Sequence, residues 1–316
     1  MDFSALDGHQ DMLSAGTPDI ARLRADAVPL LTQLDYLEQL KTEKVFPLPA
    51  GMWNALYRLE PAGVVAKISA GDNAFEVNFL RKAGELGVSV PQVFNAGKLE
   101  HDTLQNVTYF LMSYVPNCLN AWPLSHTEGG MTEAELRQLG AGIGAALAKL
   151  HTVPLGYITR FGTRVPSWKE ALTDGFSPDW DHIAANKLFD EALVPRLARA
   201  LKKTRYFEFT DGTLTHCDLN LSNVLVDAET HELRAIVDPA GYAGMPMWDL
   251  AYASMRWDYG EAFYQAMVET YQQQSDKFDA DLFYASMLVV AYRHDRFHTA
   301  TVREAVSQEI LPKLGE

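Results

Sequence analysis

The chain has 316 residues, 47% of them hydrophobic and 22% charged, and its formal net charge is −14. This composition is ordinary for a soluble globular protein, and the length suffices for two lobes or one large domain. Because nucleic-acid binding needs a basic patch, the acidic balance argues against that class of function. The charge is compatible with a cationic small-molecule partner, although acidity is too common among soluble proteins to predict one.

Cysteine usage and hydropathy bear on the compartment. The two cysteines, Cys118 and Cys217, form no CxxC motif, which argues against a disulfide framework or a structural zinc site. Residues 1–17 lack a basic region followed by an apolar stretch, and no run of about 18 apolar residues occurs. We therefore expect a cytoplasmic protein with no membrane partner.

The first 40 residues are predicted to form an arm and a helix. Residues 1–18 show little periodicity, whereas leucines at helical spacing follow as far as about Leu40. After about Leu40, the spacing of the hydrophobic residues is no longer helical.

A β-rich lobe is predicted over residues 41–115. Between its third and fourth strands, Asp72 or Asn73 is expected to cap a helix that Gly87 ends. Short apolar runs separated by Gly and Pro predict strands at residues 45–48, 55–59 and 64–68, from Val90, and from Val107 to Val115.

Residues 116–316 are predicted to form a mostly helical lobe. Thr132 and Glu135 form a capping box for a helix that reaches His151. After it we expect an irregular, partly helical insertion at about residues 155–205, two short strands within 213–238, and helices from about Trp248.

The most informative segment is His216–Asp227. Asp218 precedes Asn223 by five positions, and a second Asp comes after the aliphatic run that follows. Phosphoryl transfer from a metal nucleotide needs a carboxylate that orients a hydroxyl and takes its proton, and further oxygens that hold Mg²⁺ against the phosphates. One short loop would present such groups to the same cleft. The alternative is a polar hairpin that joins Leu214 to Val226, with Asp and Asn in turn positions.

This loop resembles that of the aminoglycoside phosphotransferase and choline kinase families, which are small-molecule kinases with the protein-kinase fold. Cys217 replaces their usual Gly, which reaches φ > 0 more cheaply. The resemblance extends over about residues 45–298 and implies an α+β, protein-kinase-like fold of two lobes. Their pattern is H-G-D-L-x-x-x-N followed by I-D or V-D, and the matching residues are His216, Asp218, Leu219, Asn223 and Asp238.

The same resemblance implies a reaction and its cofactors. A Mg²⁺-dependent kinase would transfer a phosphoryl group from ATP, or from GTP, to a hydroxyl of a small molecule. Asp218 would be the catalytic base, and Asn223 and Asp238 would hold the Mg²⁺ ion.

His216 and Asp249 are expected to support the loop. His216 would hold it by hydrogen bonds, and the resemblance implies that Asp249 accepts backbone amides of the loop. Alternatively, Asp249 is the N-cap of a helix that begins at Leu250.

The run Gly140–Ala145 matches the dinucleotide-binding pattern G-x-G-x-x-A. That pattern needs a helix that opens at the glycines, whereas the capping box places them mid-helix. We expect them to allow close packing beneath the catalytic loop instead.

Lys67 lies inside an apolar strand, and a buried ammonium group needs a partner. The resemblance implies that Lys67 contacts the α- and β-phosphates and that Glu76, on the next helix, holds it. The alternative is an edge-strand lysine that reaches water, with Glu76 on a helix surface.

Further nucleotide contacts are expected from a turn and a hinge. The turn at residues 49–54 occupies the phosphate-covering position, where the Asn54 side chain would donate to phosphate oxygens, although an ordinary hairpin is the alternative. Residues 110–116 resemble the kinase hinge. Met112 at the back of the adenine pocket, the Ser113 carbonyl and the Val115 amide would bind adenine.

The prediction of the acceptor depends on fewer residues than that of the nucleotide site. Residues 236–241 resemble the I-D-P-x-G run of some antibiotic phosphotransferases, which favours an aminoglycoside, aminocyclitol or amino-sugar acceptor. The insertion would supply aromatic and acidic side chains that suit a cationic sugar, namely Trp168, Asp174, Asp179, Trp180 and Asp181. A solvated loop with two core tryptophans is the alternative. A metabolic choline-, fructosamine- or sugar-type kinase and a pseudokinase binding module are the alternative functions.

Overall fold

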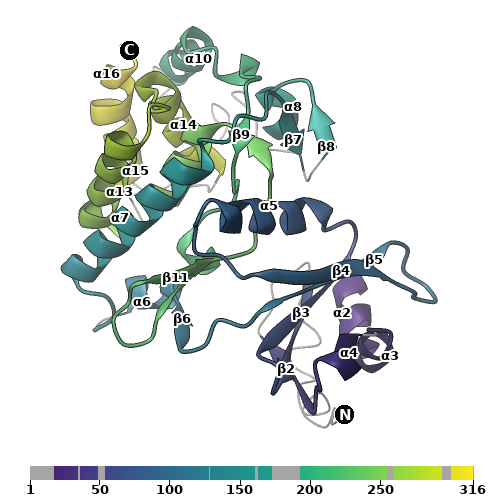
Figure 1. Cartoon of the computed structure of the whole chain (residues 1–316). Helices are drawn as coiled ribbons and strands as arrows, with labels where there is room; N and C mark the ends of the chain where they lie inside the picture. The colour runs from purple at the N-terminus through teal and green to yellow at the C-terminus, as the bar shows by residue number, and fades with distance from the viewer. Residues whose placement is uncertain are drawn as a thin grey trace. The chain divides into compact units, whose positions relative to one another are not determined.

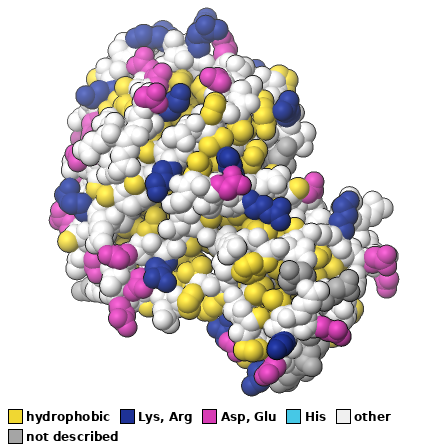
Figure 2. Space-filling view, in the orientation of Figure 1, with side chains coloured by type: hydrophobic (Ala, Val, Ile, Leu, Met, Phe, Trp, Pro, Cys, Tyr) yellow, Lys and Arg dark blue, Asp and Glu magenta, His cyan; other side chains and the backbone are white. Residues whose placement is uncertain are grey.

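The computed structural model describes residues 18–34, 36–48, 54–127, 129–160, 163–172, 193–254, 259–293 and 300–315. The chain forms two compact units (Figure 1), one of residues 1–84 and 90–116 and the other of residues 85–89 and 117–316. Acidic and basic side chains are interspersed with hydrophobic ones over the face drawn in Figure 2. Among the described residues, no helix is long and apolar enough to cross a membrane.

The first unit contains an antiparallel sheet in the order β1-β2-β3-β5-β4. Alternate residues of β2 are buried, as expected for a strand with one face on a core. The fourth strand begins later than predicted, because Pro91 has no N–H to donate to a ladder. The strands are β1 (Lys44–Leu48), β2 (Asn54–Glu60), β3 (Val64–Ala70), β4 (Val93–Leu99) and β5 (Val107–Ser113).

Three short helices replace the single helix predicted before the sheet, and the prediction of one helix was wrong. They are α2 (Pro18–Ala25), α3 (Ala27–Thr32) and α4 (Tyr36–Gln39). In a continuous helix, the ring of Pro29 would meet the carbonyl of Ala25. The chain breaks at Asp26 and places Pro29 in the first turn of α3, where no N–H is needed. Apolar side chains of α2 and α3 pack on one face of the sheet.

Helix α5 (Ala74–Glu85) follows β3 and carries Glu76 on a buried face. Asp72 Oδ1 accepts the amide of Ala74 at 2.8 Å, so the predicted start is confirmed. Gly87 has φ +68°, a conformation that ends helices and suits glycine.

The second unit is built on two long helices, α7 (Glu133–Leu150) and α13 (Glu261–Gln274), and the predicted capping box is present at the start of α7. A Cβ at Gly140 or Gly144 would collide with a carbonyl oxygen of α13, from Phe263 or Met267. The glycines therefore allow α7 to approach α13. The expectation that they pack beneath the catalytic loop was wrong.

The segment around the motif contains three strands rather than the two predicted. They are β9 (Thr213–Leu214), β10 (Val224–Asp227) and β11 (Leu233–Ile236), with the short helix η3 (Leu221–Asn223) before β10. Leu214 pairs with Ala243 of β12 (Ala243–Gly244), whereas Val226 pairs with Leu233. Because Leu214 and Val226 lie in different sheets, the hairpin alternative was wrong.

Helix α11 (Pro246–Ser254) begins two residues before the predicted start and is buried throughout. The other elements of this unit are β6 (Cys118–Asn120), α6 (Ala121–His126), β7 (Ile158–Arg160), β8 (Thr163–Val165), α8 (Trp168–Leu172), α10 (Leu193–Lys203), η2 (Tyr206–Glu208), α14 (Ala280–Arg293), α15 (Ala300–Ala305), η5 (Val306–Ile310) and α16 (Leu311–Lys313).

Candidate active site

The loop between β9 and η3 turns sharply at Cys217, whose φ is +65°. This is the left-handed region, so the chain adopts the conformation that favours Gly at the position where it lacks one. A Cβ at Gly241 would collide with Cys217 Sγ and Cβ. A glycine at 241 therefore makes room for the larger side chain at 217.

Asp249 of α11 holds the backbone of this loop. Its Oδ2 accepts the His216 amide at 2.6 Å, and its Oδ1 accepts the Cys217 amide at 2.7 Å. Asp249 is fully buried. Because α11 begins at Pro246, Asp249 lies inside the helix, and the N-cap alternative was wrong.

Asp249 is also in contact with a buried histidine, His151. His151 Nε2 is 3.4 Å from Asp249 Oδ2, and its Nδ1 is 2.8 Å from the Tyr271 hydroxyl. Burial raises the pKa of Tyr271 well above its ordinary value, so this phenol stays neutral and can donate to Nδ1. The sequence analysis did not identify His151 or Tyr271 as part of the site, because a buried histidine and tyrosine on long helices are typical of a core.

His216 is fully buried, and its ring links the loop to the segment that follows β11. Its Nε2 lies 2.9 Å from the carbonyl oxygen of Val237, and its Nδ1 accepts the amide of Asp218 at 3.3 Å. A carbonyl oxygen only accepts, so Nε2 is the donor to Val237 while Nδ1 is the acceptor from Asp218.

The Asp218 carboxylate is contacted by hydrogen-bond donors, among them Tyr252 and Asn223. Tyr252 of α11 donates to Oδ1 at 2.6 Å. Asn223 Nδ2 donates to the backbone carbonyl of Asp218 at 2.8 Å and lies 3.2 Å from Oδ2. The sequence analysis missed Tyr252, although its position one helical turn from Asp249 was a usable signal.

Asn223 and Asp238 lie at the adjoining ends of β10 and β11. Val237 donates its amide to the carbonyl of Asn223 at 3.0 Å, directly before Asp238. Asp238 is exposed and has φ +59°. No group of three or more His, Cys, Asp or Glu side chains suited to a metal occurs among the described residues. An amide oxygen and one carboxylate nevertheless fit Mg²⁺, which takes its other ligands from phosphates and water.

In the first unit, Lys67 and Glu76 form a buried ion pair. Lys67 Nζ lies 2.7 Å from Glu76 Oε1, and the two side chains are 4% and 7% exposed. Strand β3 lies in the middle of the sheet. The alternative of an edge-strand lysine that reaches water was therefore wrong.

Pairing registers show which residues share a face with Lys67. Ser69 lies opposite Asn54, and Val65 lies opposite Met112. Because side chains alternate along a strand, Asn54, Lys67 and Met112 are on one face. Asn54 Oδ1 accepts the Ser69 hydroxyl at 2.6 Å. Residues 49–53 of the expected phosphate-covering turn lie outside the described residues.

The expected hinge, residues 110–116, comprises the end of β5 and the three residues after it. Ser113 donates its amide to the carbonyl of Gln92 at 2.9 Å, and its Oγ accepts the Gln92 amide at 2.9 Å. Val115 lies just after the strand and is half-buried.

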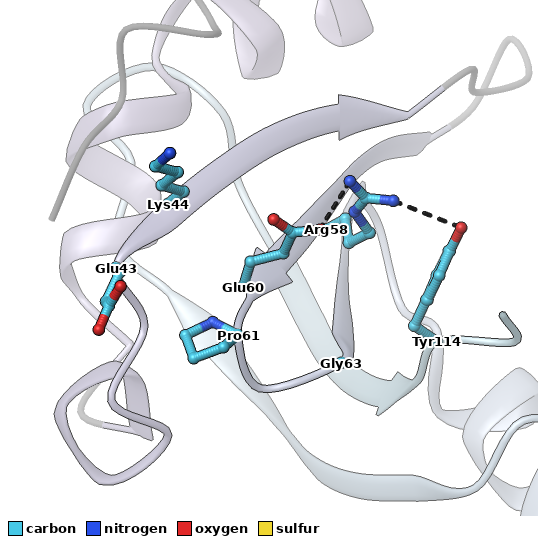
Figure 3. Close-up of a pocket in the computed structure, with 7 residues that line it drawn as sticks. All are labelled: Glu43, Lys44, Arg58, Glu60, Pro61, Gly63 and Tyr114. Carbon is cyan, nitrogen blue, oxygen red and sulfur yellow. Dashed lines mark hydrogen bonds and ion pairs between the residues drawn. The ribbon is translucent and has the colours of Figure 1, made fainter.

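A pocket of about 430 Å³ opens beside this segment (Figure 3). Arg58 lies between the rings of Phe46 and Tyr114, at 5.1 and 5.2 Å, and pairs with Glu60 at 2.7 Å. Arg58 lies opposite Val65 and so shares the face of Lys67. The lining residues are Glu43, Lys44, Arg58, Glu60, Pro61, Gly63 and Tyr114.

Of the expected acceptor residues, only Trp168 lies among the described residues. Trp168 is only 2% exposed and packs edge-on against Trp248 with ring centroids 5.7 Å apart. It is a core residue, so its burial argues against the expected acceptor contact. Asp174, Asp179, Trp180 and Asp181 lie outside the described residues.

The fold and the loop together define a small-molecule kinase with a protein-kinase-like fold. A model of the phosphotransferase enzyme family matches residues 26–282. The chain belongs to this family, which confirms the resemblance found in its sequence. A search of curated proteins finds no match.

Three solved structures illustrate the likeness. A choline/ethanolamine kinase family protein from Mesorhizobium loti is 17% identical, with a TM-score of 0.56, and the match covers 94% of this chain and 97% of that one. A thermostable mutant of the aminoglycoside phosphotransferase APH(4)-Ia, in complex with ADP and hygromycin B, is 14% identical, with a TM-score of 0.53 and coverages of 88% and 96%. A fructosamine-3-kinase candidate from Haemophilus somnus 129PT is 15% identical, with a TM-score of 0.51 and coverages of 92% and 98%. At these identities the likeness shows the fold.

Proposed function

We propose that the protein transfers the γ-phosphoryl group of ATP, or of GTP, to a hydroxyl of a small molecule in the presence of Mg²⁺. The arrangement around Asn223 carries this proposal. Its side chain donates to Asp218, while its carbonyl accepts the amide that precedes Asp238. One residue thus links the proposed base to the second proposed metal ligand.

In this reaction, Asp218 orients the acceptor hydroxyl and takes its proton. Asn223 and Asp238 would hold Mg²⁺, which supplies positive charge against the phosphate oxygens. There is little covalent chemistry for the protein to perform, so positioning and electrostatics supply most of the rate.

The first unit would bind the nucleotide. Lys67, held by Glu76, would contact the α- and β-phosphates, and Asn54 on the same face would donate to phosphate oxygens. The backbone of Ser113 and Val115 would bind the edge of the base, with Met112 behind it. The shared face of the sheet supports this assignment.

For the acceptor, we favour an aminoglycoside, aminocyclitol or other amino sugar, on the basis of residues 236–241. A structural neighbour was crystallised with hygromycin B, which supports this class without selecting it. A choline-, fructosamine- or sugar-type metabolic kinase is the second candidate, favoured by the other two structural neighbours. We place the protein in the cytoplasm and assign a nucleotide lobe to residues 41–115 and a catalytic lobe to residues 116–316, with residues 1–40 as a preceding N-terminal segment.

Thermal unfolding tests this function first. A ligand that binds only the native state raises the melting temperature. We expect Mg²⁺-dependent stabilisation by ATP or GTP in the unmodified protein, and loss of its Mg²⁺-dependent part in Asp238→Ala. An acceptor screen of amino sugars, aminocyclitols and amines would follow. No stabilisation at nucleotide well above millimolar would favour a pseudokinase.

A further inference from the structure

Helix α11 presents three side chains to the catalytic loop. Trp248 Nε1 donates to the carbonyl of Cys217 at 3.2 Å, and Asp249 accepts the two amides described above. Tyr252 donates to the carboxylate of Asp218. Residues 248 and 252 are one helical turn apart and project from the same face. One buried helix therefore holds three consecutive residues of the loop.

Packing fixes the direction of the Tyr252 hydroxyl. The side chain is 3% exposed, and its ring centroid lies 5.7 Å from that of Trp248. Trp248 is in turn packed edge-on against Trp168. A tyrosine enclosed in this way cannot swing away from the loop without disturbing the core.

The donors are distributed unequally over the two oxygens of Asp218. Oδ1 accepts a hydrogen bond from Tyr252 at 2.6 Å and has Asn220 Nδ2 at 3.4 Å, whereas among the described residues Oδ2 has only Asn223 Nδ2 as a donor, at 3.2 Å. Each carboxylate oxygen accepts about two hydrogen bonds. Oδ2 is therefore the oxygen with more capacity for a further donor.

We propose that Tyr252 is a positioning residue for phosphoryl transfer. By holding Oδ1, it orients Asp218 so that Oδ2 faces the acceptor hydroxyl. The acceptor oxygen forms its bond to the γ-phosphorus while the bond from that phosphorus to the β-phosphate oxygen breaks. The acceptor proton passes to Oδ2, while Tyr252 donates its hydrogen bond to Oδ1. This inference rests on the proposed function.

The variant Tyr252→Phe tests the inference, because it removes one hydroxyl and keeps the ring. We expect kcat to fall about tenfold, since a hydrogen bond to a charged group is lost at the reacting carboxylate. The KM values for nucleotide and acceptor should stay within about twofold, because Tyr252 contacts neither. The melting temperature should change little, because the ring packing is kept.

Tyr57→Phe is the matched control. Tyr57 is also a buried tyrosine, on β2, and its hydroxyl has no hydrogen-bond partner among the described residues. It should turn over at the rate of the unmodified protein. A positioning role is overturned if Tyr252→Phe matches this control in kcat, or if its losses are shared by KM and melting temperature. If the unmodified protein transfers no phosphate, the proposed function itself fails, which is a different result from equal rates in both proteins.

Discussion

The two units support their candidate residues in different ways. In the first unit, Lys67 lies on a regular central strand and forms a buried ion pair with Glu76. In the second, Asp218 lies on an irregular loop that α11, Val237 and η3 hold through several hydrogen bonds. On the regular strand, only the charge of the Lys67 ammonium needs compensation. The loop contains a residue at positive φ, so its backbone must be held at several points.

The largest expected effect is a loss of kcat in the second unit that leaves nucleotide binding in the first unit intact. Asp218→Asn removes the proposed base, and we expect kcat to fall about 10²–10⁴-fold while nucleotide binding stays nearly intact. Steady-state kinetics and Mg²⁺-dependent melting shifts measure the two quantities. Loss of both together would mean that Asp218 is not the base.

The second prediction concerns the buried ion pair of the first unit. Glu76→Gln leaves the ammonium of Lys67 buried without its counter-charge, so we expect a loss of about 3–5 kcal/mol in the free energy of unfolding. Glu60→Gln is the control, because its pair with Arg58 is much more exposed and should contribute about 0–1 kcal/mol. Urea unfolding of both variants measures the difference, and equal losses would contradict it.

The helix scaffold of the second unit offers a matched glycine pair. Gly144→Ala would push a Cβ into the carbonyl of Met267, so we expect a loss of about 1–3 kcal/mol. Gly142→Ala meets only ordinary contacts with Leu233, at 3.6 and 3.7 Å, and should stabilise α7 by up to about 1 kcal/mol. Thermal unfolding of both variants measures the difference in stability. Changes of the same sign would show that the α7–α13 approach is not limited by Gly144.

The smallest effect concerns the loop backbone itself. Cys217→Gly should change the free energy of unfolding by less than about 1 kcal/mol, because relief at φ > 0 offsets lost packing against Gly241. Cys217→Val should cost about 1–3 kcal/mol, because a β-branched residue is strained at this φ. Chemical unfolding with kinetics on both variants tests the contrast. A Val variant as stable as the Gly variant would show that the loop relaxes.

Local patterns in the sequence determined much of the fold. The alternation of β2, the capping box before α7 and the turn at Gly87 after α5 each depend on neighbouring residues alone. The motif from His216 to Asn223 was also visible in the sequence, although α11 holds its backbone. The pair of Lys67 and Glu76 was also predictable, since a buried ammonium needs a nearby acid.

Tertiary structure decided the rest. Only packing placed Leu214 and Val226 in different sheets, directed the glycines of α7 toward α13, and brought Tyr252 to a carboxylate 34 positions earlier in the chain. Local patterns do not specify such partners, because a buried tyrosine has the same sequence signature whether its hydroxyl meets a catalytic carboxylate or another core residue. Its role depends on which surface the folded chain packs against it.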